Sequence, residues 1–359
     1  MKNWFIEQQL NWTFLDQQDF IQDLAACEQD SIWHAEGNVY VHTKMVIDAL
    51  LQLPEYQQCT PNDQYILQLA ALLHDIAKPQ CTFVEDGRIV SPRHAKVGEK
   101  VTRDYLWDMP FGQRETVCSL VRLHGLPLWS LDKPNPNREV IASSWRVRNE
   151  LIYIIAKADV LGRICQDQAE LLERAEYFKE LCLENDCYTA PRTFYNEHSR
   201  FKFFQNNDAY PADRFDDTAF EVIILSGIAG SGKDTYAATL DMPMVSLDDL
   251  RIAMKVKRGD TTGEGHVVQR AYQMAKTYAA HQQSFVWNST NITADMRAKI
   301  INALLPYNPK FKIVYLETSV QNVFNRRQGQ IPRAALQKMY RSLDLPQYTE
   351  AHEVVYIRQ

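Results

Sequence analysis

The chain has 359 residues, a length that favours two domains, and its 45% apolar and 23% charged residues exclude a disordered chain. Its 39 Lys and Arg face 45 Asp and Glu, a net charge of −6, which argues against a generic nucleic-acid binder because such proteins meet phosphate with basic charge. Seven scattered cysteines without a CxxC pair argue against a cysteine-based zinc site and favour a reduced, cytoplasmic protein.

Apolar stretches along the chain are short. The run EVIILSGIAG, which begins at Glu221, is well below the roughly 20 residues that a membrane helix needs. The N-terminus MKNWFIEQQLNW lacks a basic start followed by an apolar run. We therefore expect a soluble, cytoplasmic protein that does not contact a membrane.

The periodicity of the apolar residues changes twice along the chain. From Asp19 to about Asp186 they recur every three or four positions, which predicts an all-α domain over residues 1–186. Residues 187–218 lose this periodicity and carry Pro, Asn, Asp and aromatics, so we expect an inter-domain connection that packs against a domain. Residues 219–359 alternate between strand-like and helical stretches, which predicts an α/β domain with a parallel sheet.

Polar residues lie on the apolar faces of three predicted helices in the first domain. His42 shares a face with Val46, the pair His74-Asp75 follows the apolar run ILQLAALL, and Asp159 shares a face with Ile155. Burying each of these side chains alone is costly. Joint binding of a divalent metal ion offsets the cost, because neutral imidazole and carboxylate are ligands that such ions accept. One His-Asp pair on a helix is more often structural, so only the whole set indicates a metal site.

The order His, His-Asp, His, His, Asp resembles that of the HD-domain phosphohydrolases over residues 30–165. The segments WHAEGNVYVHT, LLHDIAKP, PRHAKVGE and KADVLGR are similar to the HD domains of CCA-adding tRNA nucleotidyltransferases, which act on 2′,3′-cyclic phosphates. The resemblance implies one or two divalent transition metals such as Mn, Co or Ni. It implies that Asp75 bridges the two ions and that the first also has His42, His74 and Asp159 as ligands, the second His94 and His124.

Two basic residues follow the expected ligands by one helical turn. A bound divalent ion activates water for phosphoester hydrolysis, and Lys78, after His74, and Arg163, after Asp159, are expected to hold the phosphate as catalytic residues. A solvated helix end explains each of them equally well. His34 and Glu36 also match the nucleotidyltransferase-type pattern, and we assign them no role.

In the second domain, GIAGSGKDT follows the apolar run FEVIILS and opens a helical stretch, which is the setting of a P-loop. Gly227, Gly230, Ser231 and Gly232 are expected to surround the phosphate chain of ATP or another NTP with backbone N–H groups. Lys233 is expected to reach the outer phosphates. This strand-turn-helix setting makes the P-loop prediction specific.

The magnesium position of this P-loop departs from the usual pattern. The residue after Lys233 is normally Ser or Thr, whose hydroxyl contacts Mg²⁺, but this chain has Asp234 there and Thr235 next. Either side chain could serve the magnesium of a bound NTP. The sequence leaves this choice open.

Further strands are predicted at MPMVSLDD, SFVWNST and FKIVYLET, and the first ends in Asp248-Asp249. A carboxylate at a strand end beside a P-loop is what a kinase needs to accept the proton of an attacking hydroxyl. Asp248 or Asp249 could instead cap a helix that begins near Leu250, and we expect that one of them does.

The segments SLDDLR, WNSTN and NRRQGQIP resemble the phage polynucleotide kinase family, across the whole second domain. The resemblance implies that Asp248 is the general base and that Arg251 grips the acceptor phosphate. It also implies that Arg326 or Arg327 belongs to a lid over the donor phosphates. The family usually has Asp where this chain has Asn288, which puts any carboxylate-dependent role at that position in doubt.

The net charge differs between the two domains. Residues 219–359 hold 17 Lys and Arg against 12 Asp and Glu, a charge of +5, which leaves −11 for residues 1–218. The segment KVKR at residues 255–258 and the basic residues of a helix predicted from Pro332 could form a track for a nucleic-acid backbone. Solvated helix faces explain each of these equally well. The whole-chain charge therefore does not exclude a polynucleotide.

Together the resemblances imply an all-α HD domain followed by an α/β P-loop kinase domain, a pairing similar to the bacterial bifunctional enzymes that heal broken RNA ends. In that family the HD part processes a 2′,3′-cyclic phosphate or 3′-phosphate end, and the kinase part phosphorylates a 5′-hydroxyl. The implied partners are RNA or DNA ends, and a separate ligase could then join them.

Two alternatives stay open. An HD nucleotidase fused to a nucleoside or small-molecule kinase would explain the acidic chain without a polymer substrate. A nucleotide-sensing or RNA-binding regulator with inactive centres is less consistent with the sequence, because it need not retain the complete set of site residues.

Overall fold

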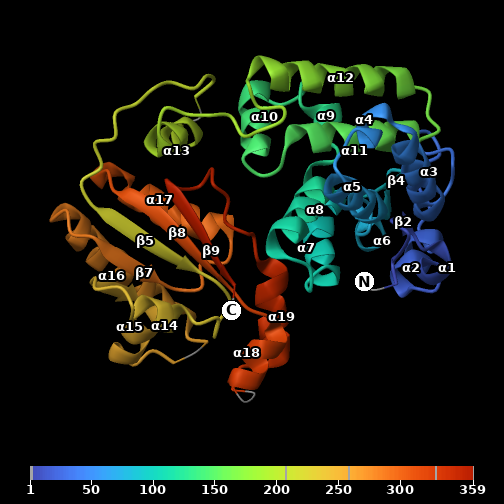
Figure 1. The fold of residues 1–359 in the computed structure, drawn as a ribbon. Helices are drawn as coiled ribbons and strands as arrows, with labels where there is room; N and C mark the ends of the chain where they lie inside the picture. The colour runs from blue at the N-terminus through green and yellow to red at the C-terminus, as the bar shows by residue number, and fades with distance from the viewer. Residues whose placement is uncertain (1–2, 207, 258, 328–329, 359) are drawn as a thin grey trace. The chain divides into compact units, whose positions relative to one another are not determined.

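A computed structural model describes residues 3–206, 208–257, 259–327 and 330–358 of the protein (Figure 1). The chain divides into two compact units, Met1–Thr193 and Phe194–Gln359. The first is helical and the second is α/β with a parallel sheet, as predicted. The division lies inside residues 187–218, where the connection was expected.

The first unit consists mainly of helices around an apolar core. Its helices are α1 (Trp12–Leu15), α2 (Asp19–Ala26), α3 (Val39–Gln52), α4 (Pro54–Gln57), α5 (Pro61–Leu73), α6 (Lys78–Cys81), α7 (His94–Tyr105), α8 (Phe111–Leu123), α9 (Leu126–Trp129), α10 (Pro136–Ser144), α11 (Asn149–Leu161) and α12 (Gln168–Glu184). Among the residues that the structure describes, no helix is both long and apolar enough to cross a membrane.

Two buried helices position the metal-ligand candidates of this unit. Helix α5 is buried continuously from Ile66 to Leu73, and α11 is buried along most of its length. The start of α5 is defined by Thr60, whose side chain accepts a hydrogen bond from the Asp63 amide, and by Pro61 at the first helical position. Because α5 ends at Leu73, the residues that follow it emerge from the core at a fixed place.

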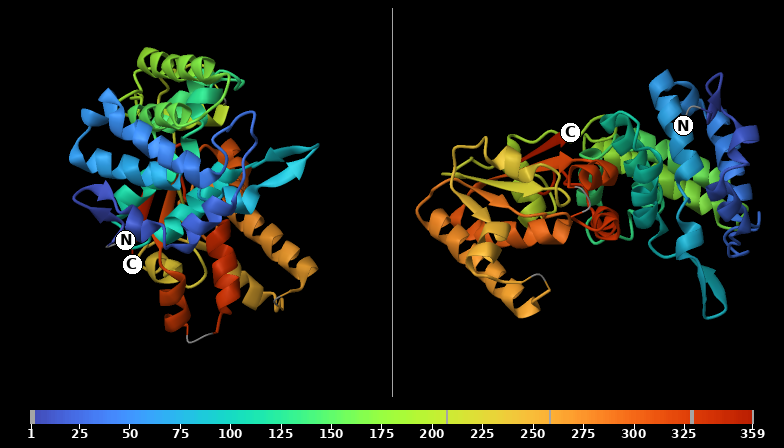
Figure 2. Two further views of the ribbon diagram at one scale, coloured as in Figure 1. Left: turned by 90° about the vertical axis from the view of Figure 1, so that its right-hand side faces the viewer. Right: turned by 90° about the horizontal axis from the view of Figure 1, so that it is seen from below.

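Two short hairpins in the first unit were not predicted. They pair β1 (Phe5–Ile6) with β2 (Gln9–Leu10) and β3 (Phe83–Glu85) with β4 (Arg88–Val90). Asp86 and Gly87 connect β3 and β4 with φ angles of 51° and 75°, the left-handed conformation that a tight hairpin turn requires. The β3–β4 hairpin extends away from the helices in both views of Figure 2.

The second unit is a parallel sheet in the order β6-β7-β5-β8-β9. Its strands are β5 (Glu221–Ser226), β6 (Met244–Ser246), β7 (Phe285–Asn288), β8 (Lys310–Glu317) and β9 (Glu353–Arg358). Its helices are α13 (Glu197–Asn206), α14 (Lys233–Ala237), α15 (Leu247–Ala253), α16 (Thr261–Ala280), α17 (Ala294–Leu304), the 3₁₀ turn η1 (Leu305–Tyr307), α18 (Val320–Arg326) and α19 (Arg333–Ser342).

Apolar side chains cover both faces of this sheet, which explains the continuous apolar run of β5. Val222 and Ile224 pack with residues of α16 and α17 on one face. Ile223 and Leu225 pack with Ala237 of α14 on the other. This doubly covered arrangement is typical of parallel sheets, and it places the turn after β5 at the carboxyl edge of the strands.

Part of the segment expected as a connection belongs to the core of the second unit. Helix α13 lies within it, and the ring of Phe201 is 5.7 Å from that of Phe311 and 4.2 Å from that of His352. Phe203 and Phe204 are also buried. The aromatic residues at 200–204 therefore pack the segment against its domain, as expected for the connection.

Candidate functional site

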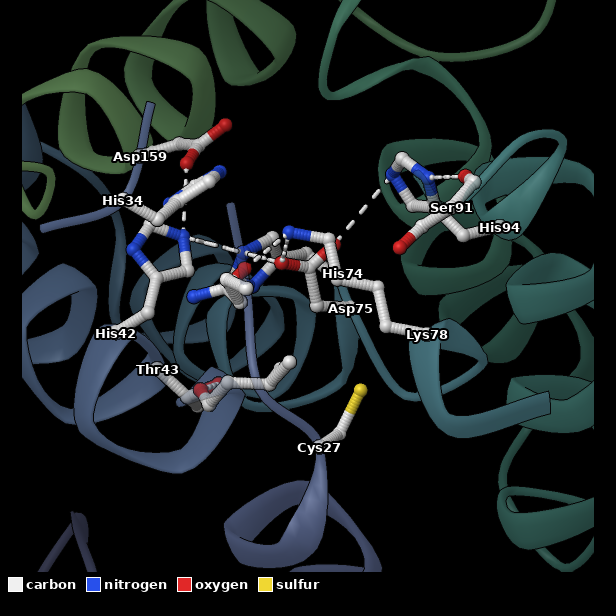
Figure 3. Close-up of polar contacts among 12 residues, drawn as sticks. Cys27, His34, His42, Thr43, His74, Asp75, Lys78, Ser91, His94 and Asp159 are labelled. Atoms are coloured by element: carbon white, nitrogen blue, oxygen red, sulfur yellow. Dashed lines mark hydrogen bonds and ion pairs between the residues drawn. The ribbon is translucent and has the colours of Figure 1, made fainter. Parts of the chain in front are cut away.

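Four histidines and two aspartates converge in the first unit. All of them except His124 are labelled in Figure 3. They come from separate segments: His42 from α3, His74 and Asp75 from the end of α5, His94 from the start of α7, His124 from the end of α8 and Asp159 from α11. The structure thus brings together all six residues that the resemblance implied as metal ligands.

The donor atoms form two groups that share Asp75. Those of His42, His74 and Asp75 lie within 4.8 Å of one another, and so do those of Asp75, His94 and His124. His42 Nε2 is 3.1 Å from Asp159 Oδ1 and 3.3 Å from His74 Nε2. Asp75 reaches both groups, because Oδ2 is 3.3 Å from His74 Nε2 and Oδ1 is 3.4 Å from His94 Nε2.

The outer nitrogens of the imidazoles set which ring atoms can bind a cation. In three rings Nδ1 contacts a backbone carbonyl, which only accepts, so Nδ1 carries the proton and a neutral ring directs the Nε2 lone pair inward. The carbonyls are those of Ala71 for His74 (2.8 Å), Ser91 for His94 (2.8 Å) and Val121 for His124 (2.9 Å). Burial also lowers the pKa of His124 to about 3, which keeps that ring neutral.

His42 is oriented in a similar way by Glu36, a residue that had no assigned role in the sequence pattern. His42 Nδ1 is 2.9 Å from Glu36 Oε1, and the same oxygen is 2.8 Å from His34 Nδ1. Glu36 Oε2 accepts a hydrogen bond from the Ile164 amide at 2.9 Å. Burial raises the pKa of Glu36, but these hydrogen bonds outweigh it and lower the pKa well below its ordinary value. The buried carboxylate therefore stays charged and holds His42 Nε2 toward the other donor atoms.

The two aspartates are buried and charged. Burial alone would raise the pKa of Asp75, but the adjacent Lys78 ammonium outweighs it and holds the pKa well below its usual range. The Arg163 guanidinium has the same effect on the pKa of Asp159. Asp75 Oδ1 accepts no hydrogen bond from the described residues. Inward lone pairs, buried carboxylates and an unsatisfied oxygen form a donor set that fits a divalent cation.

Lys78 and Arg163 lie beside these carboxylates. Lys78 Nζ is 2.7 Å from Asp75 Oδ2 and donates to Gln29 Oε1 at 2.6 Å. Arg163 binds Asp159 with two nitrogens, at 2.5 and 3.1 Å. Both residues line a cavity of about 810 Å³ that also contacts Asp75. Neither is a solvated helix end, and both are placed to contact a ligand in this cavity.

The P-loop of the second unit connects β5 to α14. Gly227, Gly230 and Gly232 have φ angles of 153°, 78° and 89°, which residues with a Cβ rarely adopt. An added Cβ at Gly227 would also lie 2.5 Å from Ser231 Oγ and 2.7 Å from the Leu316 carbonyl. The loop therefore needs glycine for both its conformation and its close packing against β8.

Lys233 lies folded into this loop. Its ammonium donates to the carbonyls of Gly227 and Ile228 at 3.0 and 2.8 Å and lies 3.4 Å from Ser231 Oγ. Burial lowers the pKa of Lys233 to about 8. The ammonium thus fills the loop with interactions that the oxygens of a phosphate chain could replace.

Asp234 pairs with the residue that departs from the kinase pattern. Asn288 Nδ2, at the end of β7, donates to Asp234 Oδ1 at 2.8 Å. The carboxylate of Asp234, on the P-loop helix α14, is thus held at the end of β7.

The expected cap at the start of α15 is wrong. Ser246, not Asp248 or Asp249, is the N-cap, and its hydroxyl accepts a hydrogen bond from the Asp249 amide at 3.2 Å. Serine caps as well as aspartate does, and the helix begins three residues earlier than expected. Asp248 is therefore not needed as a cap.

Arg251 links Asp248 to a residue that the sequence did not indicate. Arg251 forms an ion pair with Asp248 and a bidentate pair with Glu264 of α16, at 2.7 and 2.9 Å. Glu264 was missed because it lies in a separate helix and no local pattern connects it to Arg251. Glu264 fixes the guanidinium, and the guanidinium holds the Asp248 carboxylate.

The lid candidates lie at the end of α18. Arg326 is its last residue and Arg327 its C-cap. A Cβ at Gly230 would lie 3.5 Å from Arg327 Cγ and Nε, so Arg327 is adjacent to the P-loop. Of the basic residues considered as a backbone track, Arg333, Lys338 and Arg341 are exposed on α19, whereas Arg258 lies outside the described residues.

Family comparisons agree with this division of the chain. A model of the HD domain matches residues 39–162, and a model of an AAA domain matches residues 222–346. The chain thus carries an HD domain followed by an AAA domain that contains the P-loop. The matches span the His/Asp cluster and the P-loop.

Solved structures resemble part of the chain, but only weakly. A candidate kinase from Chloroflexus aurantiacus is 18% identical, covers 40% of this chain and 86% of its own, and gives a TM-score of 0.34. A gluconokinase from Sinorhizobium meliloti is 17% identical, covers 41% of this chain and 84% of its own, and gives a TM-score of 0.28. Likenesses at this level settle nothing about the substrate.

Proposed function

We propose that this chain, an HD domain joined to a P-loop kinase-like domain, heals RNA ends. The HD domain would remove a 2′,3′-cyclic phosphate or 3′-phosphate, and the kinase domain would phosphorylate a 5′-hydroxyl with ATP or another NTP and Mg²⁺. The observation that carries the proposal is the presence in one chain of a His/Asp cluster that fits divalent metal ions and of a P-loop with its lysine in place.

The geometry of the HD domain supports the first reaction. His42, His74, Asp75 and Asp159 would hold one divalent ion, and Asp75, His94 and His124 a second, at the two groups described above. Bound metal lowers the pKa of water and withdraws charge from phosphoryl oxygens. Lys78 and Arg163 would contact the remaining phosphate oxygens, because both cations already face the cavity beside the aspartates.

The geometry of the kinase domain supports the second reaction. The Gly227–Gly232 backbone would cradle the donor phosphates, and Lys233 would exchange its carbonyl partners for phosphate oxygens. Asp248 would accept the proton of the 5′-hydroxyl, since Ser246 takes the capping role. Arg251, fixed by Glu264, would hold the Asp248 carboxylate and face the acceptor phosphate.

Charge favours a polymer substrate over a free nucleoside for the kinase. Residues 219–359 have a net charge of +5 within an acidic chain, and α19 exposes Arg333, Lys338 and Arg341. A nucleoside kinase has no need of basic charge outside its nucleotide pocket, whereas a kinase that binds a nucleic-acid strand needs basic charge along the strand's phosphate backbone.

The proposal is tested with purified protein, a divalent metal, ATP and a panel of substrates. RNA oligonucleotides with a 2′,3′-cyclic phosphate, a 3′-phosphate or a 5′-hydroxyl are compared with mononucleotides and nucleosides at equal concentrations. Turnover of the oligonucleotide ends supports end healing. Turnover of the small molecules alone would refute it and favour an HD nucleotidase fused to a nucleoside or small-molecule kinase.

A further inference from the structure

Two tryptophans line the cavity beside the metal-ligand candidates, and the proposed hydrolysis gives neither of them a role. Trp33 and Trp129 both contact the 810 Å³ cavity, and their exposed fractions are 45% and 50%. Exposed tryptophan is unusual on a folded protein, and an apolar surface in a cavity commonly marks a binding site. Ile32 and Leu131, their near neighbours in the sequence, are exposed by 49% and 40%.

We propose that Trp33 and Trp129 stack on the nucleobase at the 3′ end of the RNA. The HD cavity would then bind the phosphate of a terminal nucleoside together with its base, in preference to inorganic phosphate or a sugar phosphate. This inference rests on the proposed function, because it names the substrate class of the HD site.

Each tryptophan lies in a segment that is anchored to one of the two ligand groups. Trp33 precedes His34, whose ring pairs with Glu36 and through it with His42. The turn that carries Trp33 is closed by hydrogen bonds from the Trp33 and His34 amides to the Asp30 carbonyl, at 3.1 and 2.8 Å. The indole of Trp33 is therefore attached to a segment that the first ligand group fixes.

Trp129 is the last residue of α9, which begins directly after His124 and Gly125. The guanidinium of Arg174 lies 5.6 Å from the Trp129 ring centroid, and it also donates to the Leu128 carbonyl at 3.2 Å. This cation–π contact orients the ring, while half of the residue's surface stays exposed and the residue lines the cavity. Trp129 is thus a fixed aromatic surface beside the second ligand group.

The charge pattern of the cavity fits a phosphate ester with an aromatic attachment. Lys78 and Arg163 lie at the aspartates. Elsewhere the lining mixes basic residues with the carboxylates of Asp30, Glu85 and Glu139, so uniform positive charge would not hold an RNA end there. Stacking would hold it, because every base offers a π-face to an indole. The cavity would then bind a 3′ end of any sequence.

The test compares ligands that differ only in the base. Binding of adenosine 3′-monophosphate and of ribose 3-phosphate to the full chain is measured by calorimetry without added metal. The KM for an RNA ending in a 2′,3′-cyclic phosphate is compared with that for the same RNA with an abasic terminal ribose. The variants are Trp33→Ala, Trp129→Ala and the corresponding Phe replacements, with Tyr177→Ala, an aromatic that is 53% exposed outside the cavity lining, as the matched control.

Each Trp→Ala change is expected to weaken binding of the base-bearing ligand about fivefold or more, with the abasic ligand and kcat unchanged. Phe should retain most of the affinity, and Tyr177→Ala should behave as the unaltered protein. Equal affinity of the unaltered protein for the two ligands, or unchanged affinity in both Trp→Ala variants, would overturn the inference. Tryptophan-dependent nucleotide binding without hydrolysis of any RNA end would instead refute end healing and leave the stacking intact.

Discussion

Replacing Glu36 by Gln isolates the contribution of ring orientation to the metal-ligand site. The carboxylate is buried and makes three interactions: Oε1 lies 2.8 Å from His34 Nδ1 and 2.9 Å from His42 Nδ1, and Oε2 accepts from the Ile164 amide at 2.9 Å. Glutamine has nearly the same shape but only one acceptor oxygen. Its NH₂ must therefore face either the Ile164 N–H or the imidazole N–H groups, and one donor opposes another.

The expected magnitude follows from the hydrogen bonds that the substitution removes. Hydrogen bonds to a charged group contribute about 1.5–3 kcal/mol each, and loss of a partner that orients a metal-bound histidine costs about 10–100-fold in metal affinity, or about 1.4–2.8 kcal/mol. Glu36→Gln removes the hydrogen bond from Ile164 or weakens those from His34 and His42. We therefore expect Mn²⁺ to bind about 10–100-fold more weakly.

Mn²⁺ binding is measured by competition with a chelator of known affinity, and thermal unfolding with and without Mn²⁺ gives a second readout. Glu180→Gln, at an exposed position of α12, is the matched control and should leave both unchanged. Kinase activity should persist in both variants, because Glu36 lies in the other unit. If Glu36→Gln binds Mn²⁺ as tightly as the unaltered chain, orientation of His42 by Glu36 does not support metal binding.

Three further changes test other parts of the structure. The double change Asp234→Ser with Asn288→Asp moves the carboxylate from the P-loop helix to the strand end. Each single change should weaken Mg²⁺-dependent NTP binding, and the double variant should recover it. If the losses of NTP affinity in the two single variants add up in the double variant, the pairing is contradicted. Burial lowers the pKa of His352 to about 3, below its ordinary 6.5, so the neutral ring contributes its full stability above pH 6.5. Below pH 6.5 the free energy of unfolding should fall by about 1.4 kcal/mol per pH unit, because the unfolded chain binds a proton that the folded chain does not. Urea titrations of His352→Gln should show a weaker dependence of the free energy of unfolding on pH. Ser246→Ala should destabilise the second unit by about 1 kcal/mol in the same assay, and an equally large destabilisation by Asp249→Ala would question the cap.

Part of the candidate ligand set of the HD domain was predictable because His42, His74-Asp75 and Asp159 lie on or beside apolar helical faces, whereas His94 and His124 were implied only by the family resemblance. The periodicity around His42 and Asp159 indicated polar atoms directed at the core, and the structure gives them a common centre. Their outer partners were not predictable. The carbonyls of Ala71 and Ser91 belong to the backbone, so the identity of these residues does not predict the contacts.

Strands too short to show a clear alternation of apolar and polar residues were not predicted from the sequence. Strands β3 and β4 have three residues each, too few for an alternation to appear. The Asp86-Gly87 pair that joins them is a strong hairpin signal and could have identified the turn. Contacts between distant segments were missed for another reason: Glu264 meets Arg251 only after α15 and α16 have packed.

The central claim is that two autonomous phosphate sites act on opposite ends of one kind of strand. The most direct measurement follows both ends of a single RNA that carries a 5′-hydroxyl and a 2′,3′-cyclic phosphate, with the unaltered chain, Asp75→Asn and Lys233→Ala. We predict that Asp75→Asn abolishes the 3′-end reaction and spares phosphorylation, and that Lys233→Ala does the reverse. Loss of both activities from either change in folded protein, or reaction at neither end by the unaltered chain, would contradict this claim.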